Sequence, residues 1–130
     1  MNGMAIICTA ALGVLLFGLG LVISMVRFLA KRFYGHEVDP ADGLYKLVRA
    51  HGNTGEYAAF FAVLFLYLGA HNPPGWVVAT MVAATLCRYL FVIGMVAFPT
   101  VAKPNPIRFL GASGTYFTGL ALCGAVMRTL

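Results

Sequence analysis

Residues 3–26 read GMAIICTAALGVLLFGLGLVISMV, a run without a single charged side chain. About 20 mainly apolar residues in a helix are enough to cross the hydrocarbon core of a bilayer. No Lys or Arg precedes this run, and it is longer than the apolar core of a usual signal peptide. We therefore interpret it as a retained first membrane helix.

Three further apolar runs follow, and the connectors between the runs are rich in glycine and proline, which break helices. Strands of a membrane β-barrel alternate apolar and polar residues over about ten positions, whereas these runs are continuous and longer. The sequence therefore predicts an all-α membrane protein, a four-transmembrane-helix bundle in one domain covering residues 1–130. The expected helices cover residues 4–33, 43–70, 75–97 and 106–130.

The composition supports a lipid environment. Of the 130 residues, 61% are hydrophobic and 10% are charged, whereas a soluble domain has roughly a quarter of its residues charged. The chain has nine Lys and Arg residues and four Asp and Glu residues, which gives a net charge of +5. The basic residues form no strip, so we expect no nucleic-acid partner. Lipid must instead cover much of the surface.

The basic residues predict the orientation in the membrane. Lys31, Arg32 and Lys46 flank the first connector, and Lys103 and Arg108 flank the third. The second connector and the N-terminal tail carry none. Because Lys and Arg are enriched in cytoplasmic loops, we expect the first and third connectors to face the cytoplasm and both termini to lie outside it.

Cysteine and histidine residues give no sign of a metal site or of a disulfide framework. Cys8, Cys87 and Cys123 are widely spaced within apolar runs, and their number is odd. We interpret them as small packing residues. The three histidines are too dispersed to form a metal site.

The second helix carries polar residues that lipid does not tolerate. At about 100° per residue, Asn53 lies about 40° from Arg49 and Glu56 about 20° to the other side, so these three share one face. Tyr57 lies at the edge of this face, and His51 lies about 160° away, toward solvent or a neighbouring subunit. A charge near the bilayer centre costs several kcal/mol unless it is paired or hydrated.

Two interpretations of this face stay open. Arg49 and Glu56 form an ion-pair network that sets helix register, or they line a polar cavity that opens to the cytoplasm. In the second case, Arg27, Arg88 and Arg108 are further candidates, because several arginines on one polar face suit a ligand with more than one carboxylate. Glu56 would receive an amine, so the ligand would be zwitterionic and peptide-like. For Arg27 and Arg88, snorkelling of the side chain to the interface is the alternative.

The segment RAHGNTGEY, residues 49–57, resembles the second-helix signature of the MAPEG family, the membrane-associated proteins in eicosanoid and glutathione metabolism. The signature is Arg, three residues, Asn, two residues and Glu, often followed by Tyr. The segment NPIRFLG, residues 105–111, looks like the corresponding element of bacterial members. The resemblance covers essentially the whole chain, with an arginine in the third helix and another opening the fourth.

The resemblance implies a homotrimer in a bacterial inner membrane, with glutathione as co-substrate bound between subunits near the cytoplasmic face. Arg108 would lie near the sulfur and favour the thiolate, which is the nucleophile. A lipophilic small molecule would enter from the bilayer, and no metal is implied. The candidate ligand-binding residues are Arg27, Arg49, His51, Asn53, Glu56, Tyr57, Arg88 and Tyr89.

The sequence also departs from the family pattern. Relatives carry Tyr or His about one and two turns after the third-helix arginine, where this chain has Phe91 and Met95. We therefore carry two hypotheses: a glutathione transferase or peroxidase acting on lipophilic electrophiles, or a non-catalytic protein that binds a ligand or partner. A small multidrug exporter is a third. It is disfavoured because Arg49, two turns from Glu56, would keep that carboxylate ionised.

Overall fold

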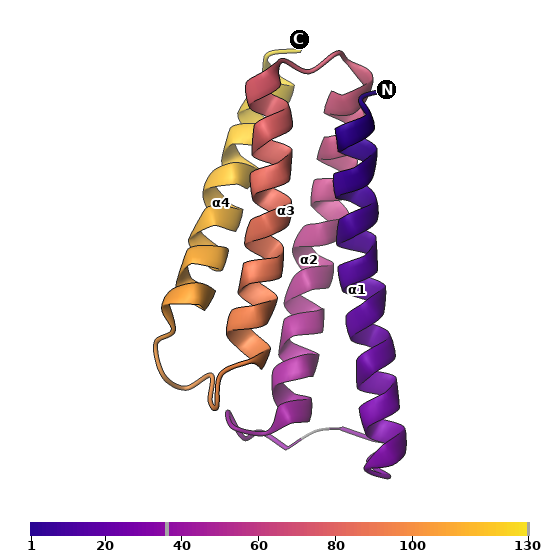
Figure 1. Ribbon diagram of the computed structural model, residues 1–130, viewed down its shortest axis with the longest axis vertical. Helices are drawn as coiled ribbons and strands as arrows, with labels where there is room; N and C mark the ends of the chain where they lie inside the picture. The colour runs from indigo at the N-terminus through magenta and orange to yellow at the C-terminus, as the bar shows by residue number, and fades with distance from the viewer. Residues whose placement is uncertain (36, 130) are drawn as a thin grey trace.

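The computed structural model describes residues 1–35 and 37–129 and consists of four long helices (Figure 1). The helices are α1 (Gly3–Leu29), α2 (Gly43–Ala70), α3 (Gly75–Val96) and α4 (Pro106–Met127). Both chain termini and the α2–α3 connector lie at one end, here called the terminal end (Figure 1). The α1–α2 and α3–α4 connectors lie at the other end, here called the loop end (Figure 1).

The predicted all-α fold is confirmed, and the helix bounds differ by more than one residue only at the C-terminal ends of α1 and α4. The helix α1 ends at Leu29, four residues before the predicted end, because Lys31 has a left-handed backbone with φ of 53°. An amphipathic or apolar pattern does not reveal such a turn. The helix α4 ends at Met127, and the last residue of its predicted range, Leu130, lies outside the described residues.

Three of the described helices, α1, α3 and α4, are long and apolar enough to cross a membrane. The sequence predicted four such segments. The helix α2 has 28 residues, but Lys46, Arg49 and Glu56 lower the hydropathy of its first half. Large apolar side chains elsewhere point outward; Phe17, for example, is 76% exposed. The protein is therefore an integral membrane protein whose α2 depends on its neighbours for its place in the bundle.

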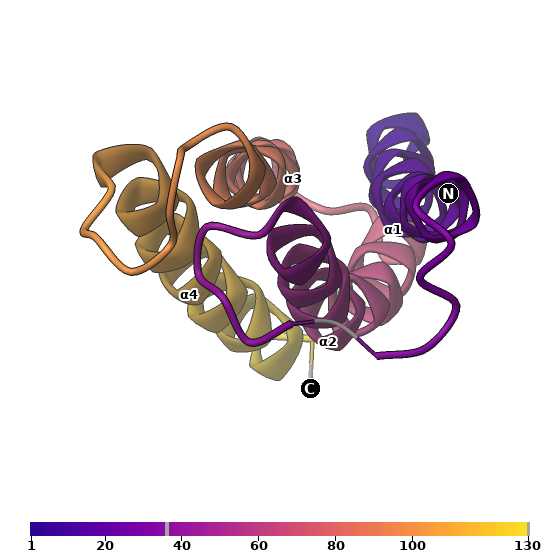
Figure 2. The same cartoon turned by 90° about the horizontal axis from the view of Figure 1, so that it is seen from below.

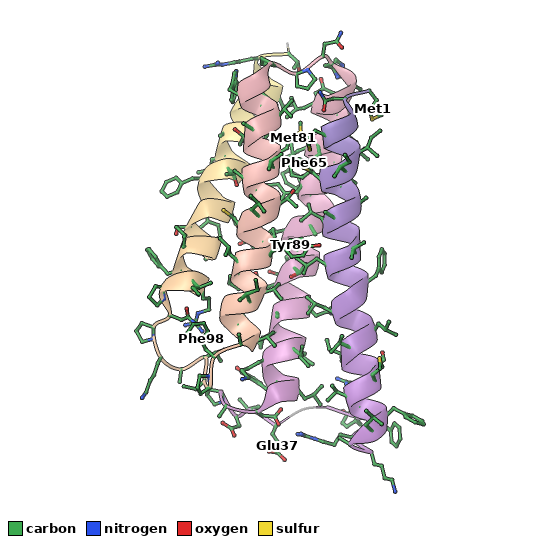
Figure 3. All side chains as sticks on the ribbon, viewed as in Figure 1. Met1, Glu37, Phe65, Met81, Tyr89 and Phe98 are labelled. Atoms are coloured by element: carbon green, nitrogen blue, oxygen red, sulfur yellow. The ribbon has the colours of Figure 1, made fainter. Side chains whose placement is uncertain are left out.

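The helices pack in two close pairs, α1 with α2 and α3 with α4. Seen from the loop end, α2 and α3 lie in the middle of the bundle, with α1 and α4 on its two flanks (Figure 2). Phe65 of α2 and Met81 of α3 are fully buried between the helices (Figure 3). Leu12 of α1 and Leu122 of α4 complete the same apolar core.

Glycines allow α3 and α4 to approach closely. A Cβ atom on Gly94 would lie 2.7 Å from the Cα atom of Arg108, and one on Gly111 would lie 2.7 Å from the Cα atom of Phe91. Small residues at such crossings let helix backbones meet in membranes. This contact determines where the first turn of α4 lies relative to α3, and therefore where Arg108 lies.

Side-chain caps hold the loop end together. Asn105 accepts hydrogen bonds from the backbone N–H groups of Ile107 and Arg108 at the start of α4, and its amide donates to the carbonyl of Gly94. The buried Lys46 donates to the carbonyl oxygen of Phe98 at 2.8 Å, just beyond the end of α3. These bonds satisfy helix-end groups that have no partner within their own helix.

Asp42 caps α2 in the same region. Its carboxylate accepts a hydrogen bond from the backbone N–H of Tyr45 and an ion-pair hydrogen bond of 3.1 Å from Arg32. The Tyr45 N–H, and after it Arg32, lower the pKa of Asp42 below its ordinary value of 3.8, against the raising effect of burial. This cap therefore needs an ionised carboxylate.

Candidate functional site

A cavity of about 650 Å³ opens at the loop end between α2, α3 and α4. Its volume is within the range of about 300–1,000 Å³ that is typical of small-molecule sites. The polar side of its wall comes from α2 and from the first turn of α4, and the apolar side comes from α3 and the α3–α4 connector. The lining residues are Tyr45, Val48, Arg49, Gly52, Asn53, Glu56, Phe91, Met95, Val101, Arg108 and Tyr116.

The structure brings together the polar face that helical spacing predicted on α2. Arg49, Asn53 and Glu56 all line the cavity. Arg49 and Glu56 are exposed, and the structure shows no ion pair or hydrogen bond of either side chain within residues 1–35 and 37–129. Within one chain, the two charges therefore do not form the ion-pair network considered above. Both are available to a ligand or a second subunit.

Arg88 supports this face from behind and does not line the cavity. Its side chain is 1% exposed, and its guanidinium lies 5.0 Å from the ring centre of Tyr57 and 4.8 Å from that of Phe91. One terminal nitrogen donates to Asn53 Oδ1 at 2.9 Å. Because a guanidinium only donates, the amide oxygen of Asn53 must face Arg88. The amide nitrogen of Asn53 is then left as a hydrogen-bond donor for the cavity.

Arg108 lines the cavity from the first turn of α4. Its two terminal nitrogens donate to the backbone carbonyls of Val101 at 2.8 Å and Lys103 at 3.2 Å. These acceptors are neutral, so they orient the guanidinium without cancelling its charge. Among the described residues, these two bonds use two of its five N–H donors.

The apolar wall contains Phe91 and Met95, so α3 presents no hydroxyl or imidazole there. Two tyrosines line the cavity as well, Tyr45 of α2 and Tyr116 of α4, and neither was proposed from the sequence. Tyr45 is four residues before Arg49, a spacing that places both on one helical face, so the signal for it was present. Tyr116 lies on another helix, and only the packing of α4 against α2 brings it to the cavity.

The other residues proposed from the sequence lie outside the cavity. Tyr57 packs against Tyr116, with 5.9 Å between the ring centres, and lines an adjacent apolar groove between α2 and α4. The hydroxyl of Tyr89 donates to the carbonyl of Ala11 in α1 (Figure 3). The ring of His51 faces Gly20 of α1, and Arg27 is also on α1, away from the cavity. His51 and Tyr89 point away from the cavity because they face α1, whereas Tyr57 faces α4.

Comparisons with known proteins agree with this architecture. The sequence model of the MAPEG family matches residues 5–128, which is nearly the whole chain. No curated protein matches the chain, and no solved structure does. The match includes α2 and α4, the two helices that carry the arginines of the cavity. The chain therefore belongs to the MAPEG family.

Proposed function

We propose that the protein binds glutathione in the loop-end cavity and uses it as a transferase or peroxidase acting on lipophilic electrophiles. The proposal rests mainly on one observation: the polar face of α2 and the side chain of Arg108 line the same cavity. Membership of a family concerned with glutathione and eicosanoid metabolism supports the choice of ligand.

The charges of the cavity suit the charges of glutathione. The tripeptide has two carboxylates, one ammonium group and a thiol. Arg49 and Arg108 provide two cations for the acidic groups, and Glu56 provides one anion for the ammonium. The amide nitrogen of Asn53, oriented by Arg88, would donate to a carbonyl or carboxylate oxygen. Bidentate arginine–carboxylate contacts are among the stronger polar contacts that proteins make.

In the proposed transferase reaction, the sulfur of glutathione forms a bond to an electrophilic carbon while the thiol proton and the leaving group depart together as an acid. In the peroxidase reaction, two glutathione molecules reduce a hydroperoxide to an alcohol and water and become the disulfide. Both reactions need the thiolate, and the positive charge of Arg108 favours that form. The apolar groove beside Tyr57 and Tyr116 borders the cavity through Tyr116 and would admit a lipophilic partner.

We further propose that the protein works as a homotrimer in a bacterial inner membrane with its loop end in the cytoplasm. All Lys and Arg residues except Arg88 and Arg128 lie in the loop-end connectors or in helix turns near them. The exposed Arg49 and Glu56 would contact both the ligand and a neighbouring subunit.

Crosslinking in mild detergent tests the assembly. It should trap trimers, and a pattern limited to monomers or dimers would contradict the proposed homotrimer.

Calorimetric titration of the detergent-purified protein with glutathione tests the function. We expect saturable binding that weakens at least tenfold in Arg49→Ala and in Glu56→Gln, because each change leaves a charged ligand group without its partner. Lys103→Ala, which removes an exposed cation from the same end, should bind as the unchanged protein does. No binding at millimolar glutathione would refute the proposal.

A second candidate is a MAPEG protein that binds the ligand without turnover. The apolar Phe91 and Met95 in the cavity wall favour it, since α3 offers no polar group beside the ligand. Tyr116 favours catalysis instead, because it lines the cavity from α4 and carries a hydroxyl group. Turnover of a general electrophile such as chlorodinitrobenzene would decide between them, with Tyr116→Phe lowering the rate if this hydroxyl assists. The exporter hypothesis finds no support in the family match.

A further inference from the structure

A second cavity lies at the terminal end, on the side of the membrane opposite to the proposed glutathione site. It has a volume of about 450 Å³ and is enclosed by the end of α2, the α2–α3 connector, the start of α3 and the end of α4. Its floor is apolar, formed by Leu68, Val77 and Ala125. Its rim is polar and aromatic, formed by His71, Trp76 and Arg128.

Arg128 gives this cavity a positive charge that no acidic side chain balances. The four Asp and Glu residues of the chain are Glu37, Asp39, Asp42 and Glu56, and all of them belong to the first connector or the first half of α2, away from this end. The guanidinium lies over the ring of Trp76, 5.8 Å from its centre. Within the described part of the chain, the Arg128 side chain makes no hydrogen bond, so its N–H donors are available.

The rim also has the composition of a membrane–water interface. Trp76 is 46% exposed, and at the end of α2 the ring centres of Tyr67 and His71 lie 4.4 Å apart. The Tyr67 hydroxyl is hydrogen-bonded to the Thr129 hydroxyl, and His71 Nδ1 donates to the Tyr67 carbonyl. Trp and Tyr rings are enriched at the depth of lipid headgroups. The bond between Tyr67 and Thr129 joins the last turns of α2 to the end of α4 beside the cavity.

We propose that this terminal-end cavity binds the phosphate group of an anionic phospholipid, with Arg128 as the phosphate contact and Trp76 as the platform beneath it. A guanidinium that stacks on a ring still has its edge free for phosphate oxygens. The apolar floor would take the first carbons of the acyl chains. This site is independent of the glutathione proposal, because the two cavities lie at opposite ends of the bundle and share no residue.

The chain offers a direct probe, because Trp76 is its only tryptophan. The protein is placed in vesicles of phosphatidylcholine that contain a small fraction of phosphatidylglycerol, with bromine atoms on the acyl chains of one lipid at a time. Bromine quenches tryptophan fluorescence on contact. We expect brominated phosphatidylglycerol to quench Trp76 more than its mole fraction predicts, and brominated phosphatidylcholine to quench no more than its fraction predicts.

Arg128→Gln should lower the relative affinity for phosphatidylglycerol about fivefold, since one cation near a membrane surface contributes about 1 kcal/mol. Lys103→Gln removes one cation at the loop end and should change nothing. Each quenching curve is normalised to the unquenched emission of the same variant, and thermal unfolding confirms that both variants fold. Equal quenching by the two lipids, or an unchanged preference in Arg128→Gln, would overturn the proposal.

Inorganic phosphate distinguishes the source of the anion. If the site is built for a lipid, phosphate at millimolar concentration should leave the lipid preference intact. If phosphate abolishes the preference and shifts Trp76 emission in the unchanged protein but not in Arg128→Gln, the cavity is a site for a free phosphate and the lipid assignment is wrong.

Discussion

Replacing Asn53 by Asp tests how the buried Arg88 shapes the loop-end cavity. Arg88 donates to Asn53 Oδ1 at 2.9 Å and to Thr54 Oγ1 at 3.4 Å, and its other close neighbours are the rings of Tyr57 and Phe91. Its Nε atom is buried without a hydrogen-bond partner in the described part of the chain. Among the described residues, the hydrogen-bond acceptors and the rings that this buried cation contacts are therefore all uncharged.

An aspartate at position 53 would give Arg88 a carboxylate at hydrogen-bond distance. Hydrogen bonds between two ionised groups are shorter and stronger than those with one, but the carboxylate must first lose part of its hydration. Asn53 is only half-buried, so we expect a net gain of about 1 kcal/mol in the free energy of unfolding. Asn53→Leu, of similar size, should lose about 2 kcal/mol because it leaves a buried donor unsatisfied.

Glutathione affinity should change in a different pattern. Both variants lack the amide nitrogen that we expect to donate to the ligand, so both should bind more weakly. Asn53→Asp should lose the most, at least tenfold, because it adds a negative charge beside the ligand carboxylates. Both variants should therefore bind glutathione more weakly, but Asn53→Asp should be more stable than the unchanged protein and Asn53→Leu less stable.

The assay is denaturation in mild detergent by added sodium dodecyl sulfate, followed by calorimetric titration of each folded variant with glutathione. If Asn53→Asp is destabilised as much as Asn53→Leu, then Arg88 does not use this side chain as its acceptor. If Asn53→Asp is more stable but binds glutathione normally, then the amide nitrogen is not a ligand contact.

Three further predictions concern the bundle itself. Gly94→Ala should lower the free energy of unfolding by about 1–3 kcal/mol through overpacking, measured by the same denaturation, whereas Gly13→Ala should be tolerated because no atom lies within 4 Å of its new Cβ. Lys46→Met should cost about 1–3 kcal/mol in that assay, since it leaves carbonyl groups at the end of α3 without their donor. The capping contribution of Asp42, whose pKa is lowered chiefly by the Tyr45 N–H, should be fully present above its ordinary value of 3.8 and lost as the pH falls through its lower folded-state pKa. In the unchanged protein, the backbone amides at the start of α2 should therefore lose protection from hydrogen exchange below the folded-state pKa of Asp42. In Asp42→Ala, the same amides should already be less protected at neutral pH.

The number and position of the helices were readable from the sequence for a physical reason. A bilayer demands about 20 apolar residues in each crossing, so the runs and their glycine and proline connectors are visible without any tertiary information. The turn at Lys31 was not visible, because a left-handed residue other than glycine leaves no trace in an apolar pattern. The helix α2 has a lower hydropathy than α1, α3 and α4, because Lys46, Arg49 and Glu56 lie in its first half.

The α2 part of the cavity was also readable, because Arg49, Asn53 and Glu56 are related by one helical repeat and any α-helix places them on one face. The sequence could not show whether Arg88, on α3, also lines the cavity. Its distance from the cavity depends on how α3 is rotated against α2, which the sequence of α3 does not show.

The sequence alone determined the membrane class, the all-α fold, the shared polar face of α2 and the likeness to the MAPEG family. Only the tertiary structure decided which arginines reach the cavity, that Tyr116 joins it, and that Tyr89 and His51 face α1 instead. The reason is that periodicity relates residues within one helix, whereas contacts between helices depend on close approach. Here Gly94 and Gly111 set that approach by letting the backbones of α3 and α4 meet.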